Sequence, residues 1–131
     1  MTVLRRALQA FAAIWAASGV ALILVPRWLL LDVFGQPVYP DYAYVQVAGA
    51  AAIALAMLAV LVSRREDAWW WSTAFVVATG LGGTVTALHA AVGLPEGAGV
   101  LLWWLFAAVS AALTAFLLLG VTRASQEHPI A

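Results

Sequence analysis

Four long apolar stretches fill most of this 131-residue chain, at residues 7–25, 43–62, 69–92 and 98–121. Each is close to the ~20 residues that a helix needs to cross a hydrocarbon layer about 30 Å thick. The pattern therefore predicts an all-α polytopic membrane protein. We expect one domain, an antiparallel bundle of four transmembrane helices, with residues 122–131 as a short cytoplasmic tail.

The composition supports a membrane location independently of the pattern. Hydrophobic residues make up 66% of the chain and charged residues 9%, against about 45–50% and about 25% in soluble domains. The net charge is zero, so nothing indicates a nucleic-acid partner. Because the chain has no cysteine, thiolate metal sites, iron–sulfur clusters and thiol nucleophiles are excluded. No motif indicates a cofactor.

The positions of the arginines predict the orientation. With an even number of spans, five of the six basic residues fall on one side: Arg5, Arg6, Arg64, Arg65 and Arg123. Only Arg27 falls on the other side. Cytoplasmic loops carry the excess of Lys and Arg, so we expect both termini to be cytoplasmic, in a bacterial inner membrane.

The connections between the stretches differ in kind. Residues 64–67 and 93–97 are short turns, which predict hairpins of the second with the third helix and of the third with the fourth. Residues 27–34 are too apolar for a free loop and too short to span. Two arrangements are open for this outer segment: it continues the first helix beyond a kink at Pro26, or it lies along or re-enters the outer membrane surface.

Candidate ligand-binding residues lie near the predicted outer ends of the helices. Thr79, Thr86 and His89 share roughly one face of the third helix, and Gln46 stands at the start of the second. They could line a narrow cavity that opens outward. The alternative is that the hydroxyls bond to their own or a neighbouring helix and that His89 is an interfacial side chain. His128 falls on the opposite side from His89, so no metal site is expected.

Three carboxylates also fall on the predicted outer face, namely Asp32, Asp41 and Glu96. A carboxyl group at a boundary between water and hydrocarbon can act as a general acid, with His89 as a possible partner. No ionisable residue falls in the middle of a span. Ion-coupled transporters generally need such a residue, so that class is excluded.

Several short runs resemble those of the small DoxX-like bacterial membrane proteins. They are the sequence LVPRWLLLDVFG at residues 24–35, a Pro- and Tyr-rich stretch, YVQVAG at residues 44–49, and Arg64-Arg65. The resemblance implies a four-helix bundle, often of unassigned role or a small partner of a membrane redox system. It implies no catalytic residues.

Two functions remain open. The favoured one is a non-catalytic module, either an accessory subunit or a binder of a lipid, quinone or isoprenoid. The alternative is a small isomerase or cyclase that acts on a lipophilic substrate with an outer-face carboxyl as general acid. Alanine-rich faces on the second and fourth helices favour a homo-oligomer or a membrane-protein partner in either case.

The predicted orientation can be tested by single-cysteine labelling, because the native chain has no cysteine. A Ser125→Cys variant should react with a membrane-impermeant maleimide only after the cells are permeabilised. Labelling from outside intact cells would overturn the orientation.

Overall fold

The computed structural model describes residues 1–37, 40–93 and 99–127, and all regular structure in these ranges is helical. The elements are α1 (Thr2–Leu24), η1 (a π-helix, Trp28–Val33), α2 (Ala43–Ser63), α3 (Ala68–Leu88), η2 (a π-helix, His89–Gly93) and α4 (Leu101–Glu127). Four helical segments in the described ranges are long and apolar enough to cross a membrane: Thr2–Leu24, Ala43–Ser63, Ala68–Gly93 and Leu101–Glu127. The predicted class, an all-helical protein with four candidate spans, is confirmed.

The first and last long helices, α1 and α4, extend beyond the apolar stretches of the sequence, at the end of the molecule that is rich in arginine. α1 begins at Thr2 rather than at residue 7, and α4 continues to Glu127 rather than ending at residue 121. Hydropathy marks the apolar part of a helix, whereas arginine is itself a good helix former and does not end one. Leu4 and Ala124 are fully buried, so both extensions pack against the rest of the molecule. The predicted start of the fourth stretch and most of the 93–97 turn lie outside the described residues.

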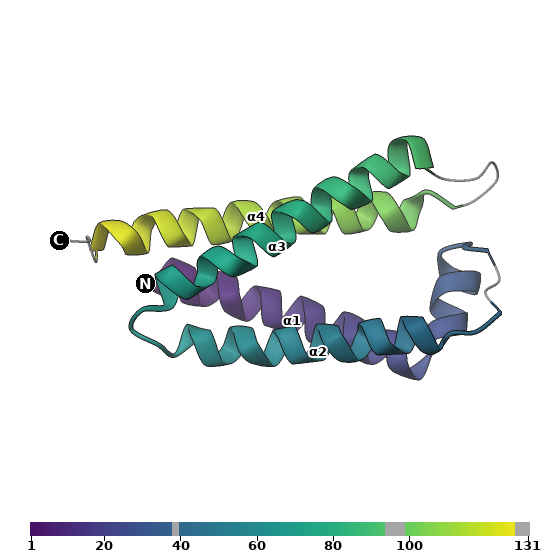
Figure 1. Cartoon of the computed structure of the whole chain (residues 1–131), viewed down its shortest axis with the longest axis horizontal. Coiled ribbons are helices and arrows are strands. Elements are labelled where there is room, and N and C mark those ends of the chain that lie inside the picture. Colours follow the sequence, from purple (N-terminus) through teal and green to yellow (C-terminus); the bar gives the residue numbers. More distant parts are fainter. Residues whose placement is uncertain (38–39, 94–98, 128–131) are drawn as a thin grey trace.

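The helices associate as two pairs. Figure 1 shows α1 beside α2 and α3 beside α4. α1 also packs against α4, which joins the pairs. α2 and α3 contact each other little although a short turn connects them. The main packing partner of α2 is therefore α1, and the predicted hairpin of the second helix with the third stays a prediction.

Glycines mark the closest approaches between helices. A Cβ placed on Gly19 of α1 would lie 2.5 Å from the carbonyl oxygen of Gly49 in α2. A Cβ on Gly120 of α4 would lie 2.6 Å from the Cα of Leu4. In a membrane, van der Waals packing of close backbones replaces the hydrophobic drive. α1 therefore depends on glycine for its contacts with both neighbours.

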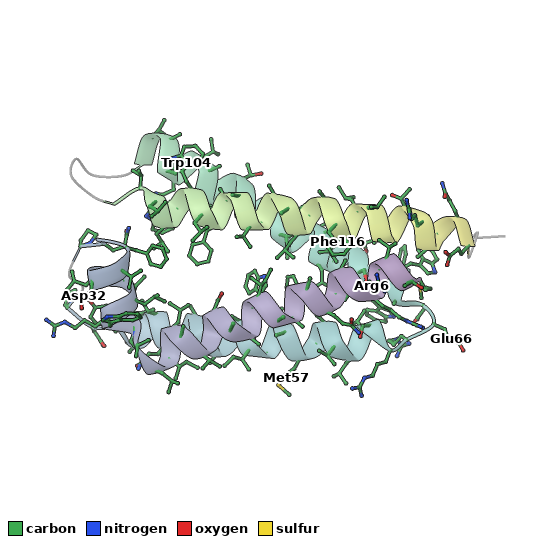
Figure 2. All side chains as sticks on the ribbon, turned by 180° about the vertical axis from the view of Figure 1, so that it is seen from behind. Arg6, Asp32, Met57, Glu66, Trp104 and Phe116 are labelled. Atoms are coloured by element: carbon green, nitrogen blue, oxygen red, sulfur yellow. The ribbon has the colours of Figure 1, made fainter. Side chains whose placement is uncertain are left out.

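The core lies at the end that carries Arg6 and Glu66, opposite Asp32 (Figure 2). We call these the arginine end and the η1 end. Phe11 is at the centre of this core: its ring stacks on Trp15 and meets Phe75 edge-on, with centroids 5.1 Å apart in both cases. Buried residues of all four long helices join this cluster, as the following show: Leu4, Leu8, Ala56, Ala59, Ala68, Phe75, Leu113 and Leu117. The four helices thus meet tightly in one half of the molecule.

The turn before α3 is held by a polar cluster. Arg65 forms an ion pair with Asp67 at 2.7 Å, and the indole nitrogen of Trp71 donates to the same carboxylate at 2.9 Å. The hydrogen bond from Arg65, followed by that from Trp71, lowers the pKa of the Asp67 carboxyl to about 2. Nearby, the guanidinium of Arg5 donates to the carbonyl of Ser63 at 3.1 Å. Asp67 is therefore ionised at neutral pH, and this carboxylate would lose its partners only as the pH falls towards 2.

The glycine contact between α1 and α2 predicts a sharp difference between two substitutions. Gly19→Ala should destabilise the protein by about 1–3 kcal/mol, because the new methyl group meets backbone that cannot move aside. Gly82→Ala is the matched control, since nothing lies within 4 Å of a Cβ placed there. The control should be neutral or slightly stabilising, because alanine favours a helix interior by roughly 0.5–1 kcal/mol over glycine. Unfolding in mild detergent measures both, and equal stability of the two variants would contradict the close approach.

Candidate functional site

Most hydroxyl side chains in the helices are bonded to their own helix. Nine of them donate to a backbone carbonyl three or four residues earlier: Ser63, Ser72, Thr73, Thr79, Thr84, Thr86, Thr114, Thr122 and Ser125. Such bonds are the usual way for a helix hydroxyl to be satisfied away from water. Thr79 and Thr86, two predicted ligand-binding residues, belong to this group. Thr79 also lies 2.8 Å from the hydroxyl oxygen of Thr114, which links α3 to α4.

Gln46 and His89, the other predicted ligand-binding residues, each contact a neighbouring helix. The side-chain amide of Gln46 donates to the carbonyl of Ile23 at 3.1 Å, which fastens the start of α2 to the end of α1. The His89 ring meets the Trp103 ring of α4 edge-on, with centroids 4.4 Å apart. In the part of the chain that the structure describes, no hydrogen bond joins the four predicted residues into one group.

The predicted acids occupy separate places at the η1 end. Asp32 is exposed on η1, and Asp41 accepts a hydrogen bond from the backbone of Ala43 at 2.9 Å, at the start of α2. Glu96 lies outside the described residues. Within the described ranges no group of three or more His, Asp or Glu residues could hold a metal ion. The convergence of these acids with His89, which acid–base catalysis would require, stays a prediction.

The segment after α1 contains η1 and lies at the η1 end of the molecule. α1 ends at Leu24 because Pro26 disfavours helical geometry at Val25, where φ is −137°. The chain then resumes as η1, which Figure 1 shows turned away from the axis of α1 towards α4. Gly35 ends the segment with a φ of 62°, a conformation that glycine adopts without strain.

Gln36 joins this segment to α4, a role that the sequence did not reveal. Its side chain is only 3% exposed. The amide nitrogen donates to the carbonyl of Gly99 at 2.6 Å, and the amide oxygen accepts from the indole nitrogen of Trp103 at 3.1 Å. Because Trp103 also contacts His89, one chain of contacts links η1, α4 and η2. The only feature of the sequence that marked this residue was a glutamine between a glycine and a proline. That pattern is equally typical of a solvated turn.

An apolar cavity of about 520 Å³ lies between the α1–α2 pair and α4. Its walls come from α1, η1, α2 and α4, and they include the side chains of Trp15, Phe34, Ala52 and Phe106. Ligand sites in proteins typically measure ~300–1,000 Å³ and are mostly apolar. No acidic, basic or histidine side chain lines the cavity. None of the candidate residues predicted from the sequence and described by the structure lines it either.

A second hollow is a groove of about 920 Å³ between α3 and α4. It is more open than the cavity, and small side chains line most of it, including those of Ala107, Ala111 and Thr79. Ala52, on the alanine-rich face of α2, is buried within the chain, whereas Ala111 is exposed in this groove. Exposed alanines nevertheless occur on both helices, among them Ala50 and Ala54 of α2 and Ala108 and Ala115 of α4, so both expected alanine-rich faces are present.

Comparisons with known proteins give this chain no relative: no family model, no curated protein and no solved structure matches it.

The contacts of Gln36 predict that it fastens the η1 end. Gln36→Leu keeps the volume of the side chain but leaves the Trp103 N–H and the Gly99 carbonyl without their partner, which should cost about 1–3 kcal/mol. Hydrogen exchange of residues 26–37 should also become faster. Gln9→Leu, at an exposed position on α1, is the control. Unchanged exchange in Gln36→Leu would show that these bonds do not hold the segment.

Proposed function

We propose that this chain is a non-catalytic integral membrane protein that binds a lipophilic molecule in the cavity between its helix pairs. The observation that carries the proposal is the cavity itself, which has the volume of a ligand site and nearly continuous apolar walls. Burial of apolar ligand surface against such walls is favourable without any charged contact.

The surroundings of the cavity fit a ligand that arrives from a membrane. Large apolar side chains cover the outside of the long helices, among them Leu58, Leu61, Val77, Leu81, Val85 and Leu118. The proposed setting is an antiparallel four-span bundle in a bacterial inner membrane, with the arginine end cytoplasmic. The excess of arginine at that end supports this orientation. The η1 segment would then lie at the outer surface.

The lining of the cavity favours binding over catalysis. An isomerase or cyclase would need an acid or base within hydrogen-bond reach of the substrate, at about 2.6–3.2 Å or through one water. Asp32, Asp41 and His89 do not line the cavity. The enzyme alternative would therefore need a substrate held elsewhere at the η1 end, near those residues.

A role as an accessory subunit is compatible with the same site. The open groove between α3 and α4 presents small side chains such as Ala108 and Ala111, which allow close approach of another membrane helix. The resemblance to DoxX-like proteins suggests the same kind of role. A partner or a second copy is thus part of the proposal, but the cavity belongs to one chain.

A matched pair of substitutions on α1 tests the proposed site. Ala13 and Ala17 are both exposed, one turn apart on α1, but only Ala17 lines the cavity. Ala17→Phe should displace co-purifying lipophilic molecules because the ring occupies the cavity, and Ala13→Phe should retain them. Native mass spectrometry from mild detergent measures the occupancy. Equal occupancy in the two variants, or none in the native chain after loading with lipid extract, would contradict the proposal.

A further inference from the structure

Ser18 of α1 and Ser110 of α4 depart from the bonding pattern of the helices. Thr2, exposed at the first position of α1, also makes no side-chain hydrogen bond among the described residues, but no helical turn precedes it. Among the described residues, neither Ser18 of α1 nor Ser110 of α4 makes a side-chain hydrogen bond, whereas nine other helix hydroxyls bond to a carbonyl of their own helix. The carbonyl of Ile14 stands one turn before Ser18 and that of Phe106 one turn before Ser110. A carbonyl in the usual position is therefore present in both cases but is not used.

Both of these serines line the apolar cavity. Ser18 lies on the α1 wall and Ser110 on the α4 wall, so the two serines line the cavity from different helix pairs. Each side chain is partly buried. Beyond the first turn of α1, the described helix serines and threonines without a side-chain hydrogen bond are thus the two serines that line this cavity.

An unpaired hydroxyl in apolar surroundings costs free energy. A ligand oxygen that accepts from the hydroxyls would remove this cost, and a single carbonyl oxygen has two lone pairs for two donors. A charged ligand group would not fit the same place, because no charged side chain lines the cavity to compensate it. The two arguments together restrict the ligand to a neutral molecule with an acceptor oxygen.

We infer that the cavity selects a neutral lipid with a carbonyl or similar acceptor oxygen inside its apolar body, bound by the hydroxyls of Ser18 and Ser110. A ketone, an ester or a quinone has this chemistry, whereas a plain hydrocarbon and an ionised fatty acid do not. The inference rests on the proposed binding function and adds which side chains determine the specificity.

Three probes of similar length separate these classes: heptadecan-9-one, n-heptadecane and palmitate. Each is titrated into the purified protein in mild detergent, and bound and free protein are measured by native mass spectrometry. The native chain should bind the ketone more tightly than the alkane, and palmitate most weakly. Loss of each hydroxyl, in Ser18→Ala or Ser110→Ala, should weaken binding of the ketone about two- to tenfold and leave the alkane unchanged.

Two variants control for effects on folding. Ser72→Ala removes a hydroxyl that bonds to the Ala68 carbonyl and borders neither hollow, so it should keep the preference for the ketone. Ser18→Thr retains a hydroxyl and should also keep the preference for the ketone.

The outcomes distinguish the inference from the function on which it rests. If the native chain binds ketone and alkane equally well, or if the serine variants keep the full preference for the ketone, the two hydroxyls do not select the ligand and the inference is wrong. The binding function would still stand in that case. If no probe binds to the native chain, the inference and the proposed binding function are both wrong.

Discussion

The close approach of α1 to its neighbours is the contact on which the rest of the structure depends. Gly19 brings α1 against Gly49 of α2, and Gly120 brings α4 against Leu4 at the start of α1. A bilayer offers no hydrophobic drive between apolar helices, so contacts of this kind supply the packing. α1 thereby becomes the element that joins both pairs, although it is neither the longest nor the most apolar helix.

The cavity lies mainly beyond the core that the four helices share. The four helices share a core around Phe11 at the arginine end, whereas at the opposite end η1 and its bonds through Gln36 connect the two pairs. Side chains there line a space instead of filling it. The site is therefore a product of unequal packing along one bundle, and no catalytic motif was needed to create it.

The sequence predicted the spans well because length and hydropathy act locally. Which helices pack together depends on which small residues face each other across the bundle. Glycine and alanine occur on so many helix faces that the sequence did not single out Gly19. Gln36 escaped notice because its burial depends on Gly99 and Trp103, more than sixty positions away. Ser18 could not be predicted either, because only the structure shows that its hydroxyl is unpaired and that the residue lines a cavity. The predicted residues Thr79 and Thr86 proved to be bonded within α3.

Part of the cavity wall lies outside the core cluster, and this has a consequence for how such a chain can change over time. Ile14, Leu105 and Phe106 border the cavity but belong neither to the buried core cluster nor to the glycine contacts. Changes in their size would alter what fits between the helix pairs without touching the glycine contacts that hold the bundle. These wall positions can therefore vary in size independently of the contacts that fix the fold.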